Sequence, residues 1–325
     1  MKERTLFKGA MLLVLLSVLI MTAGSTMAAQ KMLIGSTSAS SSHYGYFVAV
    51  SQVINNKAGL ETSVVETGAT VDNLRRIARN QVDLGLVTTN VMAQAYYGKQ
   101  SFTGKPVKAK LLWVYVIAPQ NVIVRKDSNI EKITDLTGKK FNPGMKGSAT
   151  EKTSEAVFKT LGINPDYYRG STTNIVTAIK DNNITGYVKS GAGLKLDAST
   201  RDISTFTPIS ILTLTTEQIS LIQKELPEIS IVNVPGGSGS GIGAYTTWGF
   251  AVACAAGLNL DEESAYRIVK AICEDKSVQG SAMSSVKNAD FVEMTLKYAT
   301  SPLHPGAIRY FKERGAKVPD RLIEN

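Results

Sequence analysis

Apolar positions after residue 28 follow two spacings in turn, which predicts alternating strands and helices. Short apolar or alternating runs predict strands over residues 32–35, 62–66, 82–86, 111–118, 122–125, 140–141, 184–188, 229–234 and 248–256. Apolar residues at helical spacing predict helices over residues 44–57, 71–78, 92–97, 133–136, 150–161, 175–179, 221–226, 262–273 and 291–298. No repeat of 20–50 residues is visible.

Strands that alternate with helices are typical of parallel β-α-β units. The pattern runs once over the first third of the chain and again from residue 122, so we expect an α/β fold with two blocks. Ligands of such folds bind beyond the carboxyl ends of the strands, where loops lead into helix N-termini.

The first 28 residues have the pattern of a secretory signal peptide. Lys2, Arg4 and Lys8 precede an uncharged apolar run over 10–21. A cleavage site with small residues follows over 26–28, and we place cleavage after Ala28. The run has about 12 residues, too few to cross a hydrocarbon core of ~30 Å as a permanent helix. We therefore expect a signal peptide and a periplasmic protein. An uncleaved membrane anchor is the alternative.

Composition narrows the function classes. Two Cys and two His among 325 residues leave little material for a metal centre, and we expect no metal or cofactor. After cleavage, 33 basic and 26 acidic residues give a net charge of +7, scattered without an aromatic-basic strip, so no nucleic-acid partner is expected. Cys254 and Cys273 either form a bridge or remain as two buried thiols.

One glycine-rich segment resembles a dinucleotide-binding motif but lacks its context. Residues 239–244 read G-S-G-I-G-A, yet strand-forming residues follow them where the motif needs a helix. A tight loop is the better interpretation.

Three loops rich in glycine and hydroxyl groups precede predicted helices, at residues 35–42, 67–70 and 147–150. Unpartnered backbone N–H groups and the helix dipole make such junctions anion sites. Two of the loops belong to the first block and one to the second, so facing loops would hold a small carboxylate from both sides. The alternative is that each Ser or Thr only caps its helix.

Catalytic interpretations have less support, and we expect no enzyme. Ser41 or Ser42 with His43 is the one candidate for a secreted serine hydrolase, although no G-x-S-x-G motif is present. His304 lies between two prolines at a predicted helix start, where a structural cap or a surface role is expected.

Several segments resemble a known family of solute receptors. Residues 66–77 (E-T-G-A-T-V-D-N-L-R-R-I), 82–90 (V-D-L-G-L-V-T-T-N) and 302–315 (P-L-H-P-G-A-I-R-Y-F-K-E-R-G) are similar to TAXI-family receptors, the extracytoplasmic subunits of tripartite ATP-independent periplasmic (TRAP) transporters. Residues 135–140, 147–150 and 161–163 fit the middle of that family. The resemblance extends over the whole chain after residue 28.

The resemblance implies a periplasmic-binding-protein-like fold with two α/β lobes, hinge strands and a ligand cleft. Lobe 1 would comprise residues 29–121 and 236–325, and lobe 2 residues 122–235. It also implies cleft closure on glutamate, glutamine or a related dicarboxylate, and delivery to membrane permease subunits by a monomer. A ligand-sensing or surface interaction protein on the same fold is the alternative.

The family's ligand contacts can be carried over by position. They imply ligand-binding roles for Ser38, Ser42, Tyr44, Thr70, Asn73, Thr88, Thr89, Asn90, Ser148, Thr150, Gly191 and Tyr245. Arg125 and Lys189 are the candidate ligand cations. The chain departs from the family where serines replace glycines in residues 35–44, where His43 is added, and where Ala69 stands in place of Ser.

Overall fold

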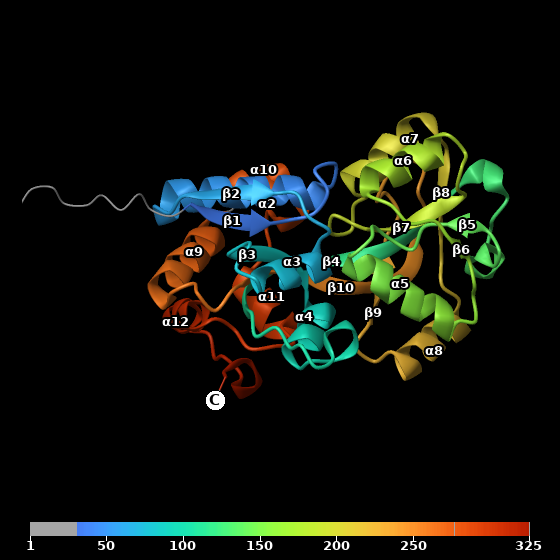
Figure 1. The fold of residues 1–325 in the computed structure, drawn as a ribbon. Coiled ribbons are helices and arrows are strands. Elements are labelled where there is room, and N and C mark those ends of the chain that lie inside the picture. The colour runs from blue at the N-terminus through green and yellow to red at the C-terminus, as the bar shows by residue number, and fades with distance from the viewer. Residues whose placement is uncertain (1–30, 276, 325) are drawn as a thin grey trace, which may run out of the picture. The chain divides into compact units, whose positions relative to one another are not determined.

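An eight-stranded sheet runs through the protein (Figure 1). The computed structural model describes residues 31–275 and 277–324, so the predicted signal peptide lies outside the described residues. The strands follow the order β2-β1-β3-β10-β4-β7, with β8 on β4 and β9 on β10. Their bounds are β1 Met32–Gly35, β2 Thr62–Val65, β3 Leu84–Thr88, β4 Lys110–Arg125, β7 Gly186–Ser190, β8 Ile209–Leu212, β9 Ser230–Val234 and β10 Tyr245–Ala256. Two short strands, β5 (Lys140–Phe141) and β6 (Asp166–Tyr167), pair separately.

Strand β4 corrects the prediction of two separate strands at 111–118 and 122–125. Gln120 and Asn121 lie between the two predicted strands, and both are buried within one 16-residue strand. Each amide makes a hydrogen bond: Gln120 Nε2 donates to Ala118 O (2.9 Å), and Asn121 Oδ1 accepts from the Tyr245 hydroxyl (2.7 Å), while Asn121 Nδ2 has no partner among the described residues. Buried polar groups with partners do not interrupt a strand.

The sheet is mixed, so the expected parallel pairing holds for only part of it. β1 pairs in parallel with β2 and β3. β10 is antiparallel to β3, β4 and β9, and β4 is antiparallel to β7 and β8. The long strands β4 and β10 return the chain through the sheet, which a local pattern of strands and helices does not reveal.

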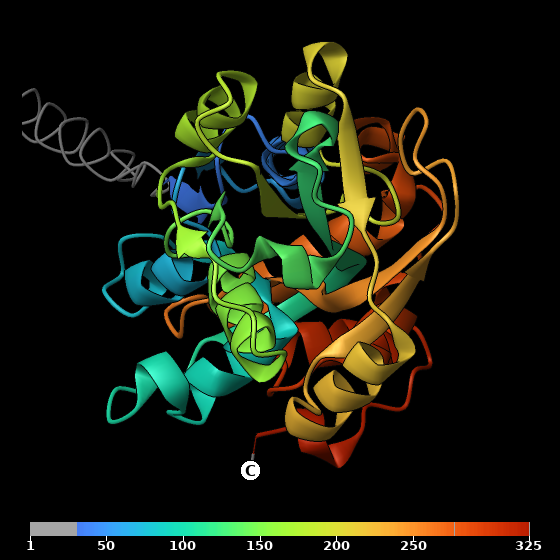
Figure 2. The same ribbon diagram turned by 90° about the vertical axis from the view of Figure 1, so that its right-hand side faces the viewer.

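Helices cover the sheet at both of its ends (Figures 1 and 2). Their bounds are α2 Ser42–Val53, α3 Thr70–Ile77, α4 Thr89–Tyr96, α5 Ala149–Thr160, α6 Thr172–Lys180, α7 Ala198–Phe206, α8 Thr216–Glu225, α9 Glu262–Glu274, α10 Ser277–Ala282, α11 Phe291–Tyr298 and α12 Pro305–Glu313. The periodicity missed α7 and α10, which are short and rich in Ser, Thr and Gln.

Two groups of apolar cores define two lobes. The larger core takes residues from 34–118 and 250–322, together with Ala149 and Ala192, and marks lobe 1. Further cores over residues 122–229, with Trp248, mark lobe 2. β4 and β10 cross between the lobes side by side, where Pro119 pairs with Gly249. The resemblance implies that the chain returns from lobe 2 to lobe 1 after residue 235. Because Trp248 packs with lobe 2, we propose that the chain returns near Gly249.

Cys254 lies in β10 and Cys273 in α9, both buried, and no disulfide joins them. Burial raises the pKa of the Cys254 thiol well above its ordinary value. Within residues 31–275 and 277–324, no helix is both long and apolar enough to pass through a bilayer.

The segment 302–315 has a packing role that its sequence only partly suggested. His304 caps α12: its Nδ1 accepts from Gly306 N (3.2 Å), and its Nε2 bonds to Leu260 O (2.9 Å). A Cβ on Gly306 would lie 2.4 Å from Glu262 O and 2.5 Å from Tyr266 N. The start of α12 is therefore pressed against the backbone of α9, and the predicted cap at His304 is confirmed.

We expect Gly306→Ala to lower the free energy of unfolding by about 3 kcal/mol, because the obstructing atoms belong to backbone. Gly45→Ala is the matched control: Gly45 is exposed in α2 and a Cβ there meets nothing within 4 Å. That variant should be more stable than the wild type by about 0.5–1 kcal/mol. Urea unfolding near neutral pH measures both, and equal stability of the two variants would contradict the close approach.

Candidate functional site

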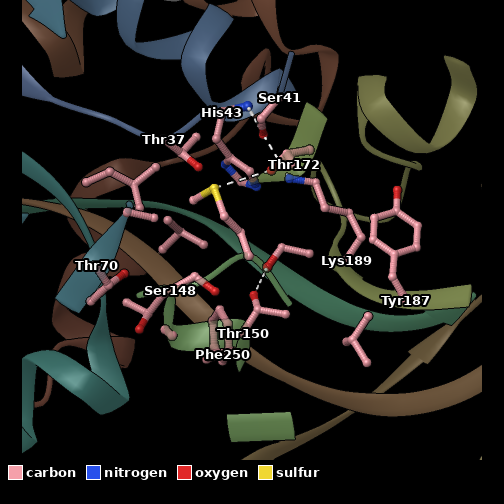
Figure 3. Close-up of a pocket in the computed structure, with 18 of the residues that line it drawn as sticks. Thr37, Ser41, His43, Thr70, Ser148, Thr150, Thr172, Tyr187, Lys189 and Phe250 are labelled. Carbon is pink, nitrogen blue, oxygen red and sulfur yellow. Dashed lines mark hydrogen bonds between the residues drawn. The ribbon is translucent and has the colours of Figure 1, made fainter. Parts of the chain in front are cut away.

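A cavity of about 50 Å³ lies between the lobes (Figure 3). Lobe 1 lines it with Thr37, Ser41, His43, Ala69, Thr70, Leu86, Thr88, Phe250 and Val252. Lobe 2 lines it with Met145, Ser148, Ala149, Thr150, Thr172, Ile175, Tyr187, Val188, Lys189 and Ser190. In Figure 3, Ser41 and His43 lie on one side of the cavity, and Ser148 and Thr150 on the other.

Five of the described helices begin at this cavity. The lining residues at these starts are Ser41 for α2, Thr70 for α3, Thr88 for α4, Ser148 for α5 and Thr172 for α6. The first turn of a helix carries N–H groups without an intrahelical partner, and the helix dipole makes that end positive. The starts of α3 and α4 have no capping side chain. The cavity therefore offers donors and positive potential to an anion.

Two hydroxyl groups at the cavity lack a partner within the described part of the chain. The Oγ1 atoms of Thr70 and Thr88 are buried and make no hydrogen bond there. A buried polar group in that state costs about 1–3 kcal/mol. Since both residues line the cavity, a ligand that accepts hydrogen bonds would supply the missing partners.

The start of α3 is held in a strained conformation. Ala69, its N-cap, has φ 64°, in the region that favours glycine, which costs about 1–3 kcal/mol. The Asn73 side chain ties this turn to its neighbours, because its Nδ2 donates to Ser36 O (2.9 Å) and Leu86 O (2.8 Å). Asn73 thus fixes the loop from behind and does not line the cavity.

Lys189 brings a positive charge to the cavity wall. Its Nζ lies 3.5 Å from Asp197 Oδ1 and 3.4 Å from Ser41 Oγ. Asp197 is fully buried behind the wall and accepts from Ser41 Oγ (2.9 Å) and Ser42 N (2.8 Å) across the lobes. Burial alone would raise the pKa of Asp197, but Lys189, His43 and the hydrogen bonds from Ser199 outweigh it, and the pKa is lowered.

His43 is buried, and both of its ring nitrogens are engaged. Nε2 lies 3.1 Å from Gly191 O, which only accepts, so Nε2 carries the hydrogen and Nδ1 accepts from the Tyr115 hydroxyl (2.8 Å). Desolvation lowers the pKa of His43 to about 4, so the ring is neutral near pH 7. Among the described contacts, neither Ser41 nor Ser42 bonds its side chain to the imidazole, which is the pairing that a serine hydrolase needs.

The structure brings some of the predicted ligand residues together. Thr70, Thr88, Ser148, Thr150 and Lys189 line the cavity. The cavity lining does not include Ser38, Ser42, Tyr44, Asn73, Thr89, Asn90, Gly191, Tyr245 or Arg125.

Three of these other residues have structural contacts instead. The Arg125 guanidinium pairs with Asp127 and donates to Ile179 O (2.6 Å). The Tyr245 hydroxyl donates to Asn121, and Asn90 Nδ2 donates to Thr153 Oγ1 across the lobes (3.1 Å).

Sequence reasoning missed several lining residues. Thr172 carries the same signal as the predicted loops, a hydroxyl-rich stretch that opens a helix, but it was not included. Ser41 lies in the loop 35–42 that is predicted to hold an anion, and it does line the cavity. Tyr187 and Phe250 lie inside strands, where no local pattern marks the residue that faces the cleft.

Over the described ranges, no three His, Cys, Asp or Glu side chains gather as a metal site would require.

A model of the NMT1-like family matches residues 34–315, most of the chain. The protein therefore belongs to the NMT1-like family.

Solved structures share its fold at low sequence identity. An ancestral arginine-binding protein bound to arginine is 14% identical, with a TM-score of 0.51, over 79% of this chain and 97% of that chain. The arginine-, lysine-, histidine-binding protein ArtJ from Geobacillus stearothermophilus is 12% identical, with a TM-score of 0.51, over 79% and 94%. A ligand-binding component of an ABC-type import system from Staphylococcus aureus, with zinc bound, is 12% identical, with a TM-score of 0.50, over 91% and 96%. The expected periplasmic-binding-protein-like fold is confirmed.

His43 should make folding stability depend on pH. Its folded pKa of about 4 lies below the ordinary 6.5, so between these values the unfolded chain binds more protons, and stability falls as the pH falls. The full loss would reach about 3 kcal/mol. His43→Gln keeps one donor and one acceptor but does not titrate, so its stability should fall less from neutral pH to about pH 4. Urea unfolding of both proteins across this range measures the difference, and parallel curves would contradict it.

Proposed function

We propose that this member of the NMT1-like family is an extracytoplasmic solute-binding protein that captures a small organic anion between its lobes. The observation that carries the proposal is the meeting of five helix N-termini, the Lys189 ammonium and two unpartnered hydroxyls at one cavity. The periplasmic-binding-protein-like fold supports it, since structures with this fold include proteins described as bound to amino acids.

We propose further that it is the binding subunit of a TRAP-type transporter of the TAXI family. Support comes from the segments at 66–77, 82–90 and 302–315 that resemble these receptors. In this proposal, residues 1–28 direct export to the periplasm, and the monomer delivers its solute to membrane permease subunits. Glutamate, glutamine and related dicarboxylates are the ligands that the resemblance implies.

Both lobes would contribute to the capture of the anion. Thr70 and Thr88 would donate from lobe 1, together with the N–H groups that open α3 and α4. Ser148 and Lys189 would donate from lobe 2. Hydrogen bonds to a charged acceptor contribute about 1.5–3 kcal/mol each. A few of them are enough, after ordering costs, for a micromolar Kd, which corresponds to a binding free energy of about −8 kcal/mol.

Hydrogen bonds between the lobes would stabilise the closed arrangement. Ser41 Oγ donates to Asp197, and Ala198 N donates to Ser42 Oγ (2.9 Å). Opening would exchange these bonds for bonds to water. Asp197 would keep Lys189, because both belong to lobe 2, so opening leaves no buried carboxylate without a cation. Small changes in β4 and β10 near Pro119 and Gly249 would carry the motion.

Removal of the unpartnered Thr88 hydroxyl tests whether this group binds the ligand or only stabilises the fold. Thr88→Val should leave the stability of the ligand-free protein unchanged or raise it by about 1 kcal/mol, and weaken anion binding about tenfold. Calorimetry on protein unfolded and refolded to remove carried-over solute measures affinity, with glutamate, glutamine, dicarboxylates and short monocarboxylates as the panel.

The matched control is Thr295→Val, because the Thr295 hydroxyl accepts from Val114 N (2.7 Å) and donates to Phe291 O (2.5 Å) away from the cavity. This variant should lose about 1–3 kcal/mol of stability and keep its affinity. The proposal is wrong if no anion of the panel binds, or if Thr88→Val behaves as Thr295→Val does.

A further inference from the structure

The charges around the cavity distinguish between classes of organic anion. Lys189 is the one charged side chain among the lining residues of the described chain, and none of that lining is Asp or Glu. The nearby carboxylate, Asp197, lies behind the wall and is engaged by Lys189, Ser41 and Ser42. A ligand ammonium would therefore face helix N-termini and a lysine without a carboxylate to pair with. Leaving a charge unpaired in such a place is costly.

One part of the wall presents acceptors. Gln120 Nε2 donates to Ala118 O, which turns Gln120 Oε1 toward Thr150 Oγ1 (2.8 Å) and Ser190 Oγ (3.0 Å). The two hydroxyls also lie 2.9 Å from each other. Gln120 Oε1 only accepts, and both hydroxyls donate to it in this arrangement, so both hydroxyl hydrogens are used within this group. Thr150 and Ser190 line the cavity, so they offer it oxygen lone pairs, which suit an uncharged donor.

The size of the cavity limits the ligand. Its volume is about 50 Å³. A carboxylate with one short substituent matches this room. A dicarboxylate would require Lys189 alone to meet two carboxylates, because no other charged side chain is among the described lining residues.

We infer that the ligand is a short monocarboxylate that carries a hydroxyl group and no ammonium group. Its carboxylate would meet the donors at Thr70, Thr88 and Lys189, and its hydroxyl would donate to the oxygens of Thr150 and Ser190. This inference rests on the proposed function and narrows the ligand class of the same site.

Three ligands that differ in one substituent test the inference. Lactate, propionate and alanine share a carboxylate on the same short carbon chain and carry a hydroxyl, a hydrogen and an ammonium at the second carbon. Calorimetry on the refolded full chain should give lactate the highest affinity, propionate about tenfold weaker, and alanine weaker still. Glycolate, acetate and glycine should repeat the order, and both enantiomers of lactate and alanine are included.

Two variants test the contacts to the hydroxyl and to the carboxylate of the ligand separately. Ser190→Ala removes one acceptor and should reduce the preference for lactate over propionate to about twofold or less, while propionate keeps its affinity. Thr88→Val should weaken lactate and propionate by the same factor, about tenfold, and leave the preference unchanged. Far-ultraviolet circular dichroism and thermal unfolding confirm that each variant is folded.

The outcomes distinguish the inference from the function beneath it. Tighter binding of alanine, glycine, glutamate or a dicarboxylate than of the hydroxy acids would overturn the inference and leave the anion-binding function standing. An unchanged preference in Ser190→Ala would overturn the role of the acceptor pair. If no carboxylate of any class binds, the proposed function itself fails, and the inference fails with it.

Discussion

The N–H groups that open α3, α4, α5 and α6 impose the constraint on which the site depends, because the first N–H groups of α2 already donate to Asp197 and Ser41. α2, α3 and α4 belong to lobe 1, and α5 and α6 to lobe 2, so closure brings positive helix ends toward one another. Like partial charges in a small space oppose closure, and an anion between them reverses the sign of the interaction. A ligand that binds the closed arrangement better than the open one shifts the population toward closure. In the proposed function, capture and closure are one electrostatic event.

The contacts behind the cavity keep the free-energy difference between the open and closed arrangements small. Asp197 offers acceptors to Ser41 and Ser42 across the lobes, which favours closure, but it holds Lys189 and Ser199 within its own lobe. The buried charge is therefore compensated in both arrangements, and opening costs only hydrogen bonds that water can replace. The neutral imidazole of His43 adds one further bond across the lobes, to Gly191 O. A receptor that must both hold and release its solute requires such a small difference.

The sequence predicts the elements well and their arrangement less well. Apolar spacing and loop chemistry located most strands, and they identified Thr70 and Ser148 at helix starts that do line the cavity. They did not reveal that β4 is one strand, because buried amides resemble a loop when their partners are unknown. Arg125 was a candidate cation by residue type, but its partner Asp127 lies two residues away and engages it locally. Side chains such as Tyr187 reach the cavity through tertiary geometry that no local pattern encodes.

The residues that make this chain similar to a family differ from the residues that would select its ligand. The segment 302–315 includes His304 and Gly306, which fix α12 against α9 and lie outside the cavity lining. Packing of that kind preserves the lobes and permits recognition of the family, but it places no constraint on the solute. In the proposed function, the solute is decided where single side chains meet the cavity: one cation at Lys189, acceptors at Thr150 and Ser190, and no carboxylate among the described lining residues. Changing one of these residues would alter the ligand without altering the fold, so the ligand class has to be argued from the cavity itself.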